Sequence, residues 1–262
     1  MTFSIAVTSG KGGVGKTNTA VNLAISLGHT GKKVLLFDAD FGLANVHVLL
    51  GTKPAKSVAD FLDKKCSMEE SITSFSNDIK IISGGSGLTE LLNLDNHRRH
   101  QILSGISNLD QDIDYLILDC PAGAADSTLF FASASDLVVV VLVEEPTSFL
   151  DAYALIKAAN LETGVKNFAV VVNMADNKSV AKSSFEKFRD IAMRFLDVNL
   201  HYAGMIPHSK EIKHAVARRR PVTIDKPNTL VSASFGEVAK RLLEVPIANI
   251  EGLKFFDKAG GK

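Results

Sequence analysis

The stretch Gly10-Lys11-Gly12-Gly13-Val14-Gly15-Lys16-Thr17 decides how this chain folds. It holds a glycine, four further residues and then Gly-Lys-Thr, placed between a predicted strand and a predicted helix. Glycines let backbone N–H groups turn toward phosphate oxygens, and a helix start adds partial positive charge. We expect Lys16 to reach the β- and γ-phosphates and the Thr17 hydroxyl to coordinate Mg²⁺. The stretch therefore predicts a phosphate-binding loop.

A second pattern overlaps the first. Gly10, Gly12 and Gly15 also satisfy the Gly-x-Gly-x-x-Gly spacing of a dinucleotide-binding site, and Asp38 ends the next predicted strand. The two alternatives differ at Lys16-Thr17, which a pyrophosphate site does not need. These two residues, together with the aspartates further along the chain, favour a nucleoside triphosphate over a dinucleotide.

Acidic residues follow two of the predicted strands. Asp38-Ala39-Asp40 comes directly after the apolar run Lys33–Phe37, and Asp119 follows Tyr115–Leu118. Parallel strands deliver such residues to the same edge of a sheet, beside a phosphate loop. There, one carboxylate can orient or deprotonate the attacking water and another can lie near the magnesium shell. In isolation, Asp38 and Asp40 would equally suit a solvated loop.

The order of the predicted elements gives the fold class. Apolar, β-branched runs alternate with helical patterns, which is typical of an α/β protein with three layers and a mostly parallel central sheet. Leu137–Val143 has no polar alternation, so it should lie in the middle of the sheet. The other predicted strands are Phe3–Thr8, Lys33–Phe37, Ile79–Ile82, Tyr115–Leu118, Phe168–Val172 and Tyr202–Ile206. The predicted helices include Thr19–Leu27, Asp151–Asn160, Ser183–Phe195 and Phe235–Leu243. We expect one domain over residues 1–246, followed by a tail over 247–262.

Composition narrows the class of protein further. The 262 residues are 46% apolar and carry 29 basic and 29 acidic side chains, as in a folded protein without an overall affinity for nucleic acid. Two cysteines, Cys66 and Cys120, lie far apart and indicate a reducing, cytoplasmic setting. Leu137–Val143, the longest apolar run, is far short of the roughly 20 residues that a membrane span needs.

In these segments the chain resembles the MinD/ParA family of ATPases with a deviant Walker A motif. The second lysine of the loop, Lys11, is the signature of that family, and the resemblance extends from Phe3 to about Leu243. It implies a P-loop NTPase fold of the SIMIBI type. It also implies hydrolysis of ATP to ADP and phosphate, ATP or ADP and Mg²⁺ as cofactors, and a homodimer when ATP is bound.

The resemblance assigns catalytic roles to three residues. Lys11 would reach the partner's phosphates across the homodimer, Lys16 would bind phosphate in its own chain, and Asp40 would position the attacking water. The residues implied to cradle the phosphates are Gly10, Lys11, Gly12, Gly13, Val14, Gly15, Lys16 and Thr17.

Metal and base contacts follow from the same resemblance. Thr17, Asp38 and Asp119 would organise the magnesium ion, the aspartates directly or through water. Asn173 corresponds to an asparagine that contacts adenine, and Pro207 would flank the base from the other side.

Two segments are similar to one group within the family, the flagellar placement and number regulators of the FlhG kind. They are Asp38–Asn45 and Glu145–Lys157. The similarity implies a switch that regulates the number or position of flagella, with a flagellar or cell-positioning protein as partner. Two alternatives remain open, namely division-site placement of the MinD type and partitioning of DNA or cargo of the ParA type.

The C-terminal tail has two interpretations. Ile247–Lys258 contains two phenylalanines, a leucine and lysines, which suit an amphipathic helix at the inner face of the plasma membrane. Gly252 and the short length weaken that pattern, and the alternative is that the tail packs back on the domain.

Three weaker signals are interpreted structurally. Arg218-Arg219-Arg220 is expected to be a solvated loop start rather than a nucleic-acid contact. His97 and His100 flank two arginines, which disfavour a bound cation. Cys120 is expected to be a small packing residue.

Overall fold

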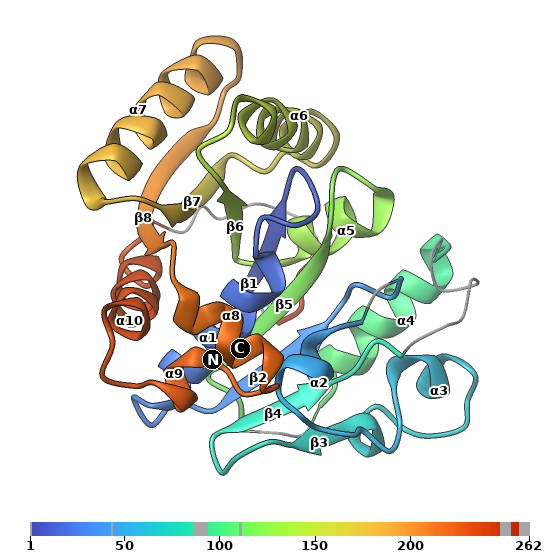
Figure 1. The fold of residues 1–262 in the computed structure, drawn as a ribbon. Coiled ribbons are helices and arrows are strands. Elements are labelled where there is room, and N and C mark those ends of the chain that lie inside the picture. The colour runs from blue at the N-terminus through green and yellow to red at the C-terminus, as the bar shows by residue number, and fades with distance from the viewer. Residues whose placement is uncertain (1, 43, 86–93, 110–111, 247–252, 257–262) are drawn as a thin grey trace.

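The fold is a twisted sheet with helices on both faces. A computed structural model describes residues 2–42, 44–85, 94–109, 112–246 and 253–256. Within these residues the sheet has eight strands in the order β3-β4-β2-β5-β1-β6-β7-β8 (Figure 1). All neighbouring strands are parallel except β3 and β4. The strands are β1 (Phe3–Ser9), β2 (Val34–Asp38), β3 (Ile72–Ser74), β4 (Ile79–Ile82), β5 (Tyr115–Ala122), β6 (Leu137–Leu142), β7 (Asn167–Ala175) and β8 (Asn199–Pro207).

The most apolar run, Leu137–Val143, contains β6, which lies in the interior of the sheet, as expected. All residues of β6 are buried, and the strand pairs with β1 on one side and β7 on the other. A strand covered on both faces can lack polar alternation, because neither face meets water. The short strand β3 was not expected; its residues Ile72 and Thr73 are only half-buried and give no apolar run to detect.

Helices form the two outer layers, so the α/β, three-layer fold class is confirmed. Apolar residues of α4, α5, α6 and α7 pack on one face of the sheet, and those of α1 and α10 pack on the other (Figure 1). The longer helices are α1 (Lys16–Gly28), α4 (Asn96–Ser107), α5 (Asp126–Ala134), α6 (Pro146–Thr163), α7 (Lys178–Phe195), α8 (Lys210–Ala217) and α10 (Leu230–Leu242). The short ones are α2 (Val46–Leu49), α3 (Val58–Leu62) and α9 (Val222–Asp225), with a 3₁₀ turn at Glu69–Ser71.

Strand alternation explains why there are two cores. Leu35 and Phe37 of β2 face the α5 layer, whereas Val34 and Leu36 face α1. Successive side chains of a strand point to opposite faces, so one apolar strand supplies both cores. Cys120 of β5 is fully buried among the first set, as a packing residue should be.

Helix α6 begins earlier than its apolar pattern indicated. Periodicity predicted a start at Asp151, whereas the helix begins at Pro146 with Glu145 as its N-cap. Proline suits the first helical position because the N–H it lacks would have no partner there. This earlier turn places Glu145 and Thr147 beside the phosphate loop.

Four residues of the C-terminal tail are described, and they pack on the domain. Leu253–Phe256 contains no helix, and Phe255 is 0% exposed, with its ring stacked on that of Phe131 in α5. The Lys254 ammonium group donates to the backbone oxygens of Ser133 and Ser135, at the end of α5. These four residues fit the second interpretation of the tail. Residues 247–252 and 257–262, which complete the proposed amphipathic segment, lie outside the described residues.

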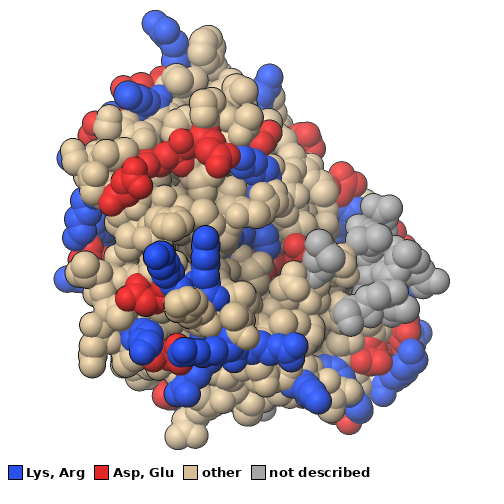
Figure 2. Space-filling view, in the orientation of Figure 1, with Lys and Arg blue, Asp and Glu red and all other residues tan. Residues whose placement is uncertain are grey.

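Charged side chains of both signs share the surface. Lysines and arginines gather over the region of α8 and α9, next to an arc of acidic residues (Figure 2). Arg218, Arg219 and Arg220 are all exposed at the end of α8, and Arg218 pairs with Asp225. None of the helices described is long and apolar enough to cross a bilayer.

Candidate functional site

Three adjacent strands deliver the predicted site residues to one edge of the sheet. Strand β5 lies between β1 and β2, and Asp38 of β2 is paired in register with Asp119 of β5. The phosphate loop follows the neighbouring strand β1 and leads into α1. The carboxyl ends of parallel strands therefore bring together three segments that are far apart in the sequence, in a crevice where α/β sheets bind ligands.

The backbone of the loop forms an open cradle. Gly13 and Gly15 have φ angles of 82° and 86°, in the left-handed region that favours glycine. A Cβ atom at Gly12 or Gly13 would meet no atom within 4 Å, so the space above these residues is free. Helix α1 begins directly afterwards at Lys16. Its N–H groups add to those of the loop as donors for an anion.

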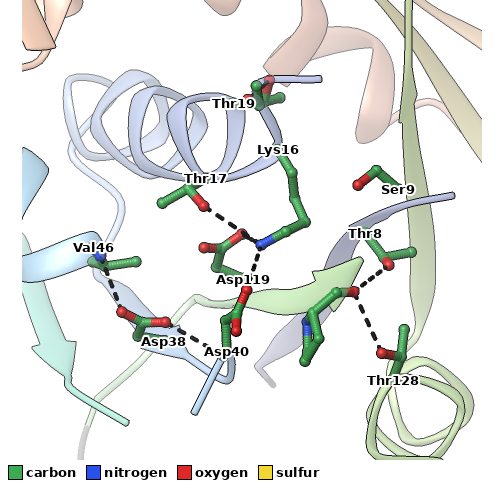
Figure 3. Close-up of polar contacts among 12 residues, drawn as sticks. Thr8, Ser9, Lys16, Thr17, Thr19, Asp38, Asp40, Val46, Asp119 and Thr128 are labelled. Carbon is green, nitrogen blue, oxygen red and sulfur yellow. Dashed lines mark hydrogen bonds and ion pairs between the residues drawn. The ribbon is translucent and has the colours of Figure 1, made fainter. Parts of the chain in front are cut away.

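A buried ion pair occupies the centre of the site. The Lys16 ammonium nitrogen lies 2.6 Å from Asp119 Oδ1 and 3.8 Å from Asp40 Oδ2 (Figure 3). Thr17, the next residue of α1, has its hydroxyl 3.4 Å from the same nitrogen. One lysine thus faces both acidic segments that the sequence singled out.

Burial and neighbouring charges shift the pKa values of Lys16, Asp119 and Asp38. Burial alone would lower the pKa of Lys16, but the nearby Asp119 and Asp40 carboxylates together outweigh it, and the pKa is raised. Burial raises the pKa of Asp119, against the opposing effect of Lys16. Burial, followed by the nearby Asp119 charge, raises the pKa of Asp38 to about 8. Lys16 is therefore a firmly positive group, and Asp38 holds a proton far more tightly than an ordinary aspartate.

The two buried aspartates differ in how their oxygens are satisfied. Asp38 accepts hydrogen bonds from the backbone N–H groups of Val46, at 3.0 Å, and Asp40, at 3.4 Å (Figure 3). Asp119 Oδ2 is buried and has no hydrogen-bond partner among the described residues. A buried carboxylate oxygen without a partner is costly, and it marks a position for a cation or a water molecule.

A largely apolar slot opens beside the loop and contains both predicted base contacts. The Asn173 side chain donates from Nδ2 to the Val14 carbonyl at 2.7 Å, so it braces the loop as well as lining the slot. Met174 has a φ angle of 54°, an uncommon backbone conformation for a residue other than glycine. The residues that line the slot include Gly15, Asn18, Asn173, Met174, Pro207 and Ile212.

Lys11 lies apart from the buried cluster. Its ammonium nitrogen is 2.5 Å from Glu145 Oε2 and 3.0 Å from Thr147 Oγ1, at the start of α6. The two lysines of the loop therefore point to different acids, Lys16 toward the strand ends and Lys11 toward the rim.

Comparisons with known proteins place the chain in a family. A ParA family model, described as NUBPL iron-transfer P-loop NTPase, matches residues 1–243. The chain belongs to the ParA/MinD family of P-loop NTPases. It is 39% identical over 254 residues to the antiactivator FleN of Pseudomonas aeruginosa, across 96% of this chain and 91% of that one. It is 36% identical over 272 residues to the flagellum site-determining protein YlxH of Helicobacter pylori, across 97% and 88%.

Solved structures of the ParA/MinD family share the fold. The chain resembles a chain of the MinC:MinD cell division protein complex of Aquifex aeolicus, with a TM-score of 0.77, 24% identity and coverage of 95% and 98%. It also resembles the Pyrococcus horikoshii MinD complexed with Mg-ADP, with a TM-score of 0.75, 22% identity and coverage of 92% and 96%. Members of this family are ATPases. The expected resemblance and the expected enzyme class, with ATP or ADP and Mg²⁺, are thus confirmed at the level of the family.

The phosphate loop and the nearby aspartates fit ATP or ADP with a magnesium ion, the cofactors of the ParA/MinD family. The open cradle at Gly12 and Gly13 has room for phosphate oxygens, and the buried Asp119 Oδ2 atom has no hydrogen-bond partner among the described residues. No three acidic, histidine or cysteine side chains of the described chain form a ready metal cage. Mg²⁺ usually keeps waters and substrate phosphates as ligands, with one or two carboxylates, and so needs no such cage.

Sequence reasoning missed the residues that complete the site. Glu145 and Thr147 belong to the segment that was similar to flagellar regulators, but nothing in that pattern showed that they contact Lys11. Met174 and Ile212 carry no motif and line the slot because it is formed where β7 ends and α8 begins. For these four residues, proximity to the phosphate loop is the sole signal.

Proposed function

We propose that this chain is an ATP-driven switch that cycles between a monomer and an ATP-bound homodimer and regulates the number or placement of flagella. The observation that carries the proposal is the loop with two separately directed lysines, Lys16 on the buried Asp119 and Lys11 on Glu145 at the rim. The high identity to FleN and YlxH, over nearly the whole chain, supports the flagellar output.

In this proposal the loop binds the triphosphate and α1 supports it. Backbone N–H groups from Gly10 to Thr17 donate to phosphate oxygens, and Lys16 balances their charge. Thr17, Asp38 and Asp119 would hold the magnesium ion, the aspartates directly or through water. Mg²⁺, when bound, neutralises charge on the phosphates. Asn173 and Pro207 flank the base in the slot beside Gly15.

Asp40 is the proposed residue for hydrolysis. Its carboxylate lies at the mouth of the site, is less buried than those of Asp38 and Asp119, and is within 3.8 Å of the Lys16 ammonium group. In this proposal it accepts a hydrogen bond from a water molecule that approaches the phosphate from solvent. Lys11 adds positive charge from the partner across the dimer.

ATP-dependent dimerisation of the Asp40→Ala variant tests the switch. Removal of the water-positioning carboxylate should leave ATP binding intact, abolish turnover and keep the dimer assembled, as measured by light scattering. The wild type should dimerise with ATP and return to monomer as ADP accumulates. A variant that remains monomeric in saturating ATP would contradict the switch and the cross-dimer role of Lys11.

The place of action depends on the tail. Leu253–Phe256 packs on α5, so a tail that binds membrane must leave this position and expose Phe255. Co-sedimentation of Asp40→Ala with anionic liposomes, in ATP and in ADP, tests membrane docking. Binding only in ATP supports a switch that acts at the membrane surface. No binding in either nucleotide supports a switch that acts on a protein partner away from the membrane.

A second candidate output is partitioning on DNA, and one observation favours it. Basic side chains gather over the region of α8 and α9 (Figure 2). Besides the Arg218–Arg220 run, which follows α8, the exposed Lys210 and Lys213 lie on α8 itself. Salt-sensitive binding of the ATP-bound dimer to duplex DNA of any sequence supports this alternative, and its absence leaves the flagellar output.

A further inference from the structure

The start of α6 forms one wall of the phosphate loop. A Cβ atom at Gly10 would come within 2.1 Å of the carbonyl carbon of Asp151, so the loop backbone packs directly on the first turns of this helix. Figure 1 shows α6 beginning beside the connection from β1 to α1. Side chains from the N-terminus of α6 are therefore positioned to act on the loop itself.

Two of these side chains hold the signature lysine. The Lys11 ammonium group donates to Glu145 Oε2 at 2.5 Å and to Thr147 Oγ1 at 3.0 Å, across sequence separations of 134 and 136 residues. All three groups belong to one chain. The ion pair thus keeps Lys11 within its own chain, whereas in the proposed dimer Lys11 contacts the partner's phosphates.

The backbone of Glu145 is held by hydrogen bonds, whereas its ion pair with Lys11 is accessible to solvent. Glu145 donates its N–H to the Val143 carbonyl at 2.7 Å and accepts from the Phe149 N–H at 3.1 Å, as the N-cap of α6. The side chains of Lys11 and Glu145 are 29% and 60% exposed. Because its carboxylate reaches solvent, Glu145 can release the Lys11 ammonium group without unfolding of the helix.

We propose that Glu145, assisted by Thr147, is a positioning residue that retains Lys11 in its own chain and opposes formation of the ATP-bound homodimer. The proposal rests on the proposed function, in which Lys11 reaches the partner's phosphates. Carboxylate and phosphate are both anions, and they compete for the same ammonium group. An exposed ion pair is weak, so this competition tunes the threshold for dimerisation and does not block it.

Glu145→Gln tests the proposal, and the neighbouring residue provides a matched control. Glu144 accepts a hydrogen bond from Ser184 of α7 at 3.2 Å, so Glu144→Gln removes the same charge at an adjacent position without touching Lys11. Both are made in the Asp40→Ala background, which stops turnover. Sedimentation velocity in saturating ATP and Mg²⁺ gives the homodimer dissociation constant. We expect Glu145→Gln to lower it about two- to five-fold. Glu144→Gln should leave it unchanged.

Labelling of the free monomer supplies an independent readout. Acylation of the Lys11 amine, followed by mass spectrometry without nucleotide, should be faster in Glu145→Gln than in Glu144→Gln. Thr147→Val should change both measurements in the same direction by a smaller amount. A dissociation constant that is unchanged or raised by Glu145→Gln overturns the opposing role of Glu145. If every variant is monomeric in ATP, the switch itself fails, and this inference fails with it.

Discussion

The ammonium nitrogen of Lys16 lies 2.6 Å from Asp119 Oδ1, although the two residues are 103 positions apart in the chain. The pair exists because β5 lies next to β1 in the sheet, so the end of one strand meets the helix that follows the other. The same ammonium nitrogen lies 3.8 Å from Asp40 Oδ2. The residue proposed to bind phosphate therefore also balances the negative charge of the aspartates around it.

Replacement of Lys16 should remove nucleotide binding. Lys16→Ala takes away the buried positive charge that faces the loop, and we expect a loss of ATP affinity of about 100-fold or more, as measured by calorimetry. Lys11→Ala is the control within the same loop. Because Lys11 contacts Glu145 and not the buried cluster, the Lys11→Ala monomer should still bind ATP. Tight binding by Lys16→Ala would exclude the assignment of the phosphate loop.

Two glycines of the loop should respond differently to alanine. Gly10→Ala would place a methyl group 2.1 Å from the Asp151 backbone, and a backbone shift of this kind costs about 1–3 kcal/mol of stability or more. Gly12→Ala meets no atom within 4 Å. It should melt at nearly the wild-type temperature but bind ATP more weakly, because the methyl group enters the phosphate cradle. Equal melting temperatures for the two variants would contradict the close packing of Gly10 on α6.

Asp38 should make the stability of the nucleotide-free protein depend on pH. Its pKa is raised to about 8 from an ordinary value of 3.8, so the folded protein holds this proton more tightly than the unfolded chain does. The free energy of unfolding should therefore fall as pH rises from about 4 to about 8. The Asn side chain of Asp38→Asn does not titrate. Over this pH range the melting temperature of Asp38→Asn should therefore fall by at least about 2 °C less than that of the wild type. Exposed Asp176→Asn is the control, and parallel curves for wild type and Asp38→Asn would refute the expectation.

The packed segment of the tail should contribute to stability through one ring. Phe255 is fully buried against Phe131, and its replacement by alanine should cost about 3–5 kcal/mol in the free energy of unfolding. Leu253, two residues earlier, is 52% exposed, and Leu253→Ala should change stability by less than about 0.5 kcal/mol. Urea denaturation measures both. A Phe255→Ala variant as stable as Leu253→Ala would show that the tail leaves α5 in solution.

Local sequence predicted most of the fold because the signals are strong over short distances. The strand Leu137–Val143 could be placed inside the sheet from composition alone, since a run without polar residues must be covered on both faces. By contrast, β3 and the first turn of α6 were missed. The strand β3 has only half-buried residues, and the start of α6 depends on a cap and a proline rather than on apolar periodicity.

The sequence by itself determined the phosphate loop, the alternation of strands and helices, and the acidic residues at strand ends, because each is a contiguous pattern with its own physical cause. Only the tertiary structure decided which groups meet. The strand order brought Asp119 to Lys16, and the packing of α6 on Gly10 brought Glu145 to Lys11. Tail residue Phe255 likewise found its partner in α5. Such pairs join residues more than 100 positions apart, and spacing along a chain carries no information on how its layers close.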